Sequence, residues 1–267
     1  GLEPRGGLPL MARRPPRGRA EQPFVIAHRG SSLEHVEHTH AAYAKAIAQG
    51  ADFLEADVRL TADGQLVCVH DRRIDRTSDG RGVVSAQTLA QLRRWDFGEE
   101  APVLLLQELI ELALGADRPV GLALETKHPV RYAGLVEQRV VEMLRDYDLL
   151  GSRFQPDQAR AYLMSFSELA MRRWRDLAPG VPCVFLMEQV PRRCRKGWLP
   201  FSAQVAGPSL EIVREHPSYV QRVHEAGGRV FVWTVDETED LQLCKTLGVD
   251  AIITNRPAFA RSLLPVR

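Results

Sequence analysis

Residues 24–58 read FVIAHRGSSLEHVEHTHAAYAKAIAQGADFLEADV, and this stretch decides the fold class. Two short apolar runs, Phe24 to His28 and Asp52 to Val58, flank a segment of helical period from His40 to Gln49. The run Val25-Ile26-Ala27 lacks apolar/polar alternation, which is typical of a strand buried on both faces. A strand, a helix and a second strand in this order predict a mostly parallel α/β sheet.

The same alternation of strands and helices continues toward the end of the chain. Further strands are predicted at Leu66 to His70, Gly121 to Lys127, Ala161 to Phe166, Pro182 to Met187, Gln204 to Gly207, Arg229 to Val235 and Ala251 to Thr254. Further helices are predicted at Leu104 to Leu114, Arg131 to Tyr147, Ser167 to Leu177, Ser218 to Ala226 and Glu237 to Leu247. Gly115, Gly227 and Gly248 follow three helices, where we expect left-handed caps.

The nine predicted strands are one too many for an eight-stranded barrel. The link from Arg59 to Gln65 is too short for a helical crossover, and Asp63-Gly64 favours a tight turn, so we expect a hairpin beside the barrel wall. A chain of 267 residues has the length of a single barrel. We expect one domain over residues 24–264, with a small cap over residues 71–102, and a disordered basic leader over residues 1–23.

Composition excludes several classes of function. Hydrophobic residues at 45% and charged residues at 26% are near globular averages, and a net charge of +1 gives no footprint for nucleic acid. No stretch approaches the roughly 18 apolar residues of a membrane span. Cys68, Cys183, Cys194 and Cys244 lie far apart, mostly in apolar runs, which predicts reduced core residues. The leader has no signal-peptide core, so we expect a cytoplasmic protein.

Ionisable residues cluster where the predicted strands end. His28-Arg29 follows the first strand, Glu55 and Asp57 lie on the second, His70-Asp71 follows the third, and Glu125 and Lys127 lie on the fourth. Such groups are costly at the ends of buried strands unless they meet a metal, a substrate or each other. The sequence therefore predicts a polar site at this end of the sheet.

The carboxylates of this site suit a metal ion. Glu55 and Asp57 are two residues apart, so both side chains face the same side of their strand. With Glu125 on another strand they offer oxygen ligands to a hard divalent cation, Mg²⁺ or Ca²⁺. The alternative is a structural network in which these carboxylates pair with Arg29, Arg59 and Lys127.

Two histidines and two cations complete the predicted site. His28 and His70 each end an apolar run, and a pair of histidines beside carboxylates can act as a general acid and a general base. Arg29 and Lys127 add positive charge that suits an anionic centre, most naturally a phosphoryl group.

Other chemistries have weaker support. His35, His38 and His40 could suggest zinc, but their spacing is not that of a metalloprotease helix, and a polar loop is the simpler interpretation. Gly-x-Ser-x-Gly, Gly-x-x-x-x-Gly-Lys and Gly-x-Gly-x-x-Gly are absent, which removes the strongest signals for a serine hydrolase or a nucleotide-binding loop.

Several ordered motifs resemble one known family. Ala27-His28-Arg29-Gly30, Gly50 to Val58, Thr61 to Gly64, Val69-His70-Asp71, Asp75 to Ser78, Leu124 to Lys127, Ser165-Phe166, Val232 to Val235 and Gly248 to Thr254 are similar to glycerophosphodiester phosphodiesterases. The resemblance runs from about Phe24 to Pro257. It implies a TIM-type (β/α)8 barrel of the phospholipase-C-like phosphodiesterase superfamily and hydrolysis of glycerophosphodiesters to glycerol 3-phosphate and an alcohol.

The resemblance also implies roles for single residues. His28 and His70 would be the acid–base pair, and Glu55, Asp57 and Glu125 the ligands of one divalent cation. Arg29 and Lys127 would bind the phosphate, and Trp233 would pack against the alcohol, or fill the core. Glu37 would orient Arg29 or the metal ligands. The nucleophile, water or a substrate hydroxyl, stays open, as do the head group and the oligomeric state.

Three segments depart from the family pattern. Val36-Glu37-His38-Thr39 stands where Pro-Glu-Asn-Thr is usual, Asn255 where aspartate is common, and Leu104-Leu105-Leu106 where Pro-Thr-Leu is usual. We expect Asn255 and the leucines to lie outside the acid–base and metal set. Two alternatives remain: a phosphodiesterase for lysophospholipids or other lipids, and a catalytically silent barrel that binds a phosphorylated ligand.

Overall fold

The computed structural model describes residues 22–128, 131–151, 153–155 and 158–264. Most of the expected leader lies outside these residues. None of the helices in the described part of the chain is long and apolar enough to cross a membrane. The four cysteines are buried and unpaired, as predicted.

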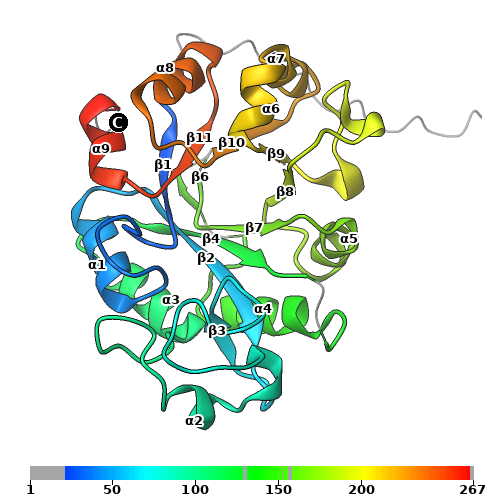
Figure 1. Cartoon of the computed structure of the whole chain (residues 1–267). Coiled ribbons are helices and arrows are strands. Elements are labelled where there is room, and N and C mark those ends of the chain that lie inside the picture. The colour runs from blue at the N-terminus through cyan, green and yellow to red at the C-terminus, as the bar shows by residue number, and fades with distance from the viewer. Residues whose placement is uncertain (1–21, 129–130, 152, 156–157, 265–267) are drawn as a thin grey trace, which may run out of the picture.

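Eight parallel strands form a closed barrel, which confirms the predicted fold class (Figure 1). In order around the wall these strands are β1 (Phe24–His28), β2 (Phe53–Leu60), β4 (Gly121–Thr126), β7 (Ala161–Ser165), β8 (Cys183–Met187), β9 (Val205–Pro208), β10 (Arg229–Trp233) and β11 (Ala251–Thr254). The barrel closes because β1 pairs with both β11 and β2. A ninth strand, β3 (Leu66–Cys68), is antiparallel to β2, so the predicted hairpin is present.

Helices cover the outside of the barrel (Figure 1). They are α1 (His40–Ala48), α3 (Leu106–Leu114), α4 (Leu135–Asp146), α5 (Glu168–Leu177), α6 (Leu210–Glu215), α7 (Ser218–Glu225), α8 (Thr238–Leu247) and α9 (Pro257–Leu263). The short helix α2 (Leu89–Leu92) lies away from the barrel wall, in the segment between β3 and α3 (Figure 1). Short 3-10 turns are η1 (Val84–Ala86), η2 (Arg192–Cys194) and η3 (Pro200–Ser202). The link from β8 to β9, described throughout, contains η2 and η3 in place of an α-helix.

Local sequence explains where several helices begin and end. The hydroxyl of Thr39 accepts a hydrogen bond from Ala42 N at 3.1 Å and so caps the start of α1. Gly227 and Gly248 have φ of 85° and 69°, which confirms two of the expected left-handed caps. The third expectation is wrong: Gly115 ends α3 with φ of −80°, a conformation that needs no glycine.

Alternation along each strand separates two cores. Outward-facing residues of β2 such as Leu54 and Ala56 pack under the helices, while Phe53 faces the barrel axis. Phe53 contacts Phe24 and Tyr162 with ring centroids 5.5 and 5.3 Å apart, and Tyr162 contacts Phe231 at 4.9 Å. These four rings, the aromatic floor, fill the barrel interior below the polar site.

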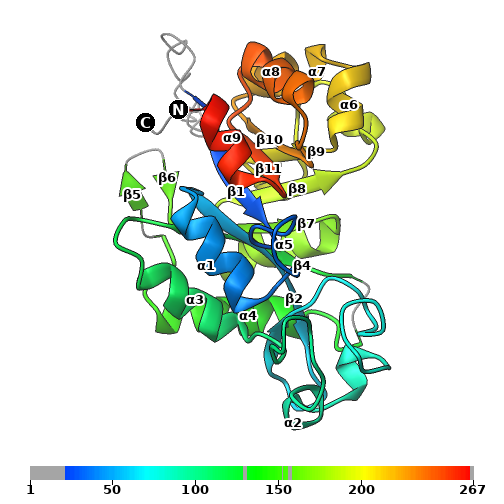
Figure 2. The ribbon, with the colours of Figure 1, turned by 60° about the vertical axis from the view of Figure 1, so that its left-hand side comes forward.

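Residues 71–102 follow β3 and contain η1 and α2. Their side chains form a third apolar cluster with the β3 hairpin: Val67, Val69, Ile74, Val84, Leu92, Phe97 and Val103. A further hairpin, β5 (Arg153–Gln155) with β6 (Gln158–Ala159), precedes β7 and was not predicted. Figure 2 shows this hairpin and α2 at opposite ends of the barrel.

Candidate active site

A cavity of about 260 Å³ opens at the carboxyl-terminal ends of the barrel strands. It is lined by His28, Arg29, Glu55, His70, Glu125, Lys127, Met164, Phe166, Leu186, Glu188, Trp233, Thr234 and Ile253. Seven of the nine site residues predicted from the sequence are in this lining. The other two contact it: Asp57 forms ion pairs with Arg29 and Lys127, and Glu37 forms one with Arg29.

Strand register places the charged residues at matching heights. On β2 the side chains of Phe53, Glu55 and Asp57 share one face, so both carboxylates lie above the aromatic floor. His28 of β1 is paired with Glu55, and Asp57 is paired with Glu125 of β4. Parallel pairing therefore gathers residues from separate parts of the chain at one end of the barrel.

Glu55, Asp57 and Glu125 form the single group of three possible metal ligands found within the described residues. One oxygen from each lies within 4.8 Å of the others, and the three residues are 1, 1 and 7% exposed. Asp57 Oδ1 is buried without a hydrogen bond, and Lys127 Nζ lies 3.3 Å from it, so this oxygen keeps lone pairs that could bind an ion. This donor set fits a hard divalent cation.

The three carboxyls differ in their tendency to ionise. Burial, with the negative charge of Asp57, raises the pKa of Glu55 well above its usual range. Burial and Asp57 also raise the pKa of Glu125, to about 8. Burial opposes ionisation of Asp57 as well, but contacts with His38, Lys127 and Arg29 hold its pKa well below the usual range. Asp57 is thus the fixed negative charge of the site.

The two predicted phosphate-binding cations are held by these carboxylates. Arg29 Nε lies 3.0 Å from Asp57 Oδ2, and the main-chain N–H of Arg29 donates to Glu55 Oε2 at 2.9 Å. Lys127 Nζ lies 2.8 Å from Glu125 Oε1 and 3.3 Å from Asp57 Oδ1. Arg29 has φ of 59°, a left-handed conformation that is uncommon outside glycine and often found at functional sites.

Glu37 links Arg29 to residues 71–102. Its Oε1 accepts from Arg29 Nη1 at 3.2 Å and from Arg76 Nη2 at 2.8 Å. Arg76 also donates to Asp71 at 2.6 Å. Arg76 was not predicted as this bridge, because its partners lie 39 and 5 residues away in different loops.

His38, one of the departures from the family pattern, contacts a candidate metal ligand directly. Its Nε2 lies 3.0 Å from Asp57 Oδ2 and its Nδ1 lies 2.8 Å from the hydroxyl of Tyr43. Tyr43 in turn donates to the main-chain carbonyl of Glu55 at 2.9 Å. His35 instead meets Glu99 and His40 is exposed, so the three histidines do not converge on a zinc site.

His28 is fixed in one tautomer by Asn255. The Asn255 amide donates from Nδ2 to Asp236 at 2.6 Å, so its Oδ1 faces His28 Nδ1 at 2.7 Å and accepts a hydrogen bond from the Nδ1–H. His28 Nε2 then carries the lone pair. Burial, with the positive charge of Arg29, lowers the pKa of His28 to about 4. Asn255 was expected to lie outside the presumed acid–base and metal residues, but it contacts one of them, His28, because β11 closes the barrel against β1.

His70 has a charged partner instead. Its Nδ1 lies 2.7 Å from Asp71 Oδ1, and its main-chain carbonyl accepts from Arg59 Nε and Nη2 at 3.0 and 2.7 Å. Burial lowers the pKa of His70, while the charge of Asp57 and the hydrogen bond to Asp71 oppose that shift. The two histidines of the cavity thus differ in the charge of their partners.

The opposite wall of the cavity is apolar. Trp233 donates from Nε1 to Gly207 O at 2.7 Å, and its ring meets Phe166 edge to face with centroids 5.5 Å apart. Lys127 Nζ lies 5.9 Å from the centre of the Phe166 ring. Phe166 belongs to a motif noted in the sequence, but its position in the cavity wall was not predicted.

Comparisons with known proteins find one family along most of the chain. A model of the glycerophosphoryl diester phosphodiesterase family matches residues 28–259. The chain is 42% identical over 257 residues to a probable glycerophosphodiester phosphodiesterase 1 of Mycobacterium tuberculosis, covering 92% of this chain and 93% of the relative. It is 31% identical to a glycerophosphodiester phosphodiesterase of Caldanaerobacter subterraneus, covering 88% and 94%.

Solved structures give the same picture. A phosphodiesterase of Oleispira antarctica, in complex with the product sn-glycerol-3-phosphate, superposes with a TM-score of 0.79 at 25% identity, covering 92% of this chain and 98% of that one. A protein of Galdieria sulphuraria described as a glycerophosphodiester phosphodiesterase superposes with a TM-score of 0.80, covering 93% and 100%. At 22% identity, the latter likeness shows the fold alone.

Proposed function

Because the chain belongs to the glycerophosphoryl diester phosphodiesterase family, we propose that it hydrolyses glycerophosphodiesters to glycerol 3-phosphate and an alcohol by acid–base catalysis with two histidines. The observation that carries this proposal is the cavity that holds His28 and His70 together with Arg29, Lys127 and buried carboxylates. The Oleispira neighbour, which holds sn-glycerol-3-phosphate, supports the product.

The partners of the two histidines assign their roles. His28 meets a neutral amide and has a pKa of about 4, so it is uncharged near pH 7 with a lone pair on Nε2. We assign it as the general base that takes a proton from the attacking hydroxyl, of water or of the substrate's glycerol.

His70 is assigned as the general acid. Its Nδ1–H donates to the carboxylate of Asp71, which stabilises the imidazolium, and its Nε2–H gives a proton to the departing alkoxide. One proton leaves the nucleophile and one reaches the leaving group, so the two histidines exchange protonation states in each turnover. Solvent restores both before the next cycle.

The charged residues of the site would hold the phosphate. Arg29 and Lys127 supply hydrogen bonds to the non-bridging oxygens, whose charge grows in the transition state. Glu55, Asp57 and Glu125 would hold one Mg²⁺ or Ca²⁺, which supplies Lewis-acid stabilisation of the same oxygens when bound. Glu37 and His38 position Arg29 and Asp57 through the contacts described above.

The apolar wall would receive the alcohol part of the substrate. The rings of Phe166 and Trp233 meet edge to face in this wall, and Glu188 is an acidic residue of the same cavity lining. A volume of about 260 Å³ suits a small water-soluble diester better than an acyl chain. Hydrolysis of lysophospholipids is the second candidate, since the same wall could accept the first carbons of a lipid.

The test measures glycerol 3-phosphate released from glycerophosphocholine by chelator-stripped protein, with Mg²⁺, Ca²⁺ or no metal added. We expect metal-dependent release, with kcat lowered roughly 10² to 10⁴-fold in His28→Asn and His70→Asn. His216→Asn, at an exposed histidine, is the matched control. Full activity in His70→Asn would reject the assignment. A parallel assay on lysophosphatidylcholine separates the two substrate classes: faster turnover of the lipid would favour the second.

A further inference from the structure

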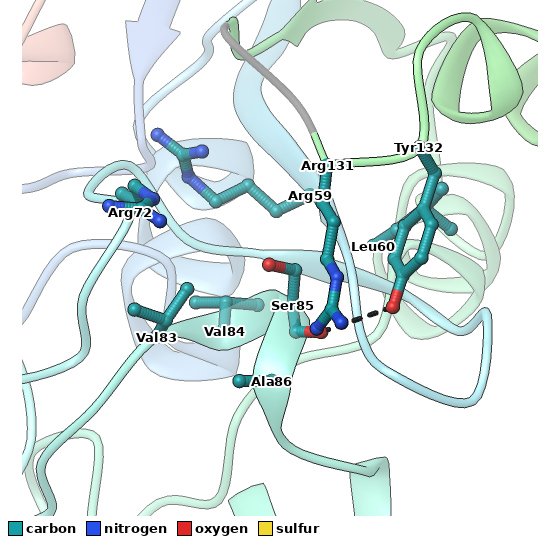
Figure 3. Close-up of a pocket in the computed structure, with 9 residues that line it drawn as sticks. All are labelled: Arg59, Leu60, Arg72, Val83, Val84, Ser85, Ala86, Arg131 and Tyr132. Carbon is teal, nitrogen blue, oxygen red and sulfur yellow. Dashed lines mark hydrogen bonds between the residues drawn. The ribbon is translucent and has the colours of Figure 1, made fainter.

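A second and larger hollow, about 490 Å³, lies beside the active site between the barrel and residues 71–102. Figure 3 shows the side chains that line it: Arg59, Leu60, Arg72, Val83, Val84, Ser85, Ala86, Arg131 and Tyr132. Arg131 and Tyr132 enter from the barrel side, and Ser85 from η1 (Figure 3). Tyr132 donates to the main-chain carbonyl of Ser85 at 3.3 Å and ties the two sides together.

Three arginines from three distant segments converge on this hollow, and none of its lining residues is acidic. Three other arginines of residues 71–102 are paired: Arg73 with Asp75, Arg76 with Glu37 and Asp71, and Arg93 with Glu108. Within the described residues, Arg59, Arg72 and Arg131 form no ion pair. The hollow therefore gathers three positive charges that have no direct ion-pair partner among the described residues.

Arg59 fixes one of these charges in place. Its guanidinium donates twice to the His70 carbonyl, at 3.0 and 2.7 Å, and the side chain is partly buried. A bound anion would reduce the repulsion between the neighbouring cations Arg59 and Arg72.

The remaining lining is suited to carbon atoms. Leu60 and Val84 are buried under the hollow, and Val83 and Ala86 are at its edge. An apolar base with arginines above it matches an organic phosphate, whose carbon skeleton rests on hydrocarbon while its oxygens accept from guanidinium groups.

The hollow is continuous with the active site. A shallow groove shares His70 and Lys127 with the catalytic cavity. It is lined by Arg59, His70, Asp71, Arg72, Arg73, Asp75, Arg76 and Lys127. The same groove shares Arg59 and Arg72 with the second hollow. A molecule whose scissile phosphate lies in the catalytic cavity can extend along this groove.

We propose that the second hollow binds a further phosphate group on the substrate, beyond the scissile diester, so that the enzyme prefers glycerophosphodiesters that carry two or more phosphates. This inference rests on the proposed function, because it concerns the substrate of the same site. Arg72 and Arg131 hold the distal phosphate, and Arg59 holds it while also supporting His70.

The experiment compares two substrates in the wild type and in the Arg72→Gln/Arg131→Gln double variant. Glycerophosphocholine has one phosphate, and glycerophosphoglycerophosphoglycerol has two. We expect the double variant to raise KM for the two-phosphate compound by on the order of tenfold and to leave kcat and KM for glycerophosphocholine within about twofold. Arg94→Gln, at an exposed arginine outside the hollow, is the matched control and should change neither.

Two results would overturn the inference. Equal KM changes for both substrates, or none, would show that the arginines do not read the second phosphate. The other result concerns free phosphate. Inorganic phosphate would alter kcat for glycerophosphocholine in the wild type but not in the double variant, and the double variant would leave KM for the two-phosphate compound unchanged. The hollow would then bind a free anion and not the substrate. Failure of the wild type on both substrates would instead reject the proposed function.

Discussion

Binding of a metal ion to the carboxylate site should release protons. Burial and the charge of Asp57 raise the pKa of Glu125 to about 8, and Glu55 is raised well above its usual range by the same causes. At pH 7 the protonated form of Glu125 exceeds the ionised form by about ten to one, so this carboxyl holds about 0.9 proton. A metal ligand must be ionised, so the ion displaces that proton.

The magnitude follows from the three ligands. Asp57 is already ionised and contributes nothing, Glu125 contributes about 0.9 proton, and Glu55 contributes up to about one more. We therefore expect about one to two protons released per Mg²⁺ or Ca²⁺ at pH 7. The number of protons released from Glu125 falls as pH rises through about 8. Below that pH, the apparent affinity for the metal ion should increase about tenfold for each unit of increasing pH and each proton displaced.

The assay is isothermal titration calorimetry of chelator-stripped protein at pH 7 in two buffers with different ionisation enthalpies. The difference in observed heat divided by the difference in buffer enthalpy gives the number of protons. Glu125→Gln removes one ionisable ligand and should reduce that number by about one. Binding heats that are the same in both buffers for the wild type would refute the reasoning, as would the absence of any metal binding.

Three further predictions concern single contacts. Asn255→Ala removes the acceptor of His28 Nδ1, and we expect kcat to fall about 10- to 100-fold with folding unchanged, measured by steady-state kinetics and circular dichroism. Asp71→Asn removes a hydrogen bond that raises the pKa of His70, so the protonated form of His70 is lost at a lower pH. The alkaline limb of the pH profile of kcat/KM should therefore shift to lower pH. A shift to higher pH would contradict the assignment of His70 as the acid. Gly121→Ala places a Cβ 2.3 Å from the Phe53 ring, which should cost about 1 to 3 kcal/mol in urea unfolding, whereas Gly180→Ala, with its nearest contact at 3.4 Å, should cost less.

Much of the barrel could be predicted because buried strands carry a strong local signal. Val25-Ile26-Ala27 and Ala251-Ile252-Ile253 are apolar on both faces, and each became a wall strand. The β5–β6 hairpin and α6 lacked such a signal. Arg153–Gln155 and Leu210–Glu215 are short and mixed in polarity, so packing against neighbours decides their conformation more than propensity does.

The site residues also divide into those with a local sequence signal and those that depend on long-range contacts. Spacing alone placed Glu55 and Asp57 on one face, because alternation is a property of every strand. The partners of His28 and Glu37 depend on contacts across 227 and 39 residues, which appear only when the barrel closes and the loops meet. If the first and last strands had been assumed to be adjacent, Asn255 would have been expected next to His28, because Ala27 pairs with Thr254.

The aromatic floor closes the far end of the active-site cavity, so the cavity opens at the carboxyl-terminal end of the barrel. Phe24, Phe53, Tyr162 and Phe231 fill the passage beneath the carboxylates, so nothing can leave through the far end of the barrel. In the proposed reaction, the alcohol and glycerol 3-phosphate would both leave through the opening by which the diester enters. If Arg29 and Lys127 bind the phosphate as proposed, glycerol 3-phosphate would leave last and would compete with the next substrate molecule for the site.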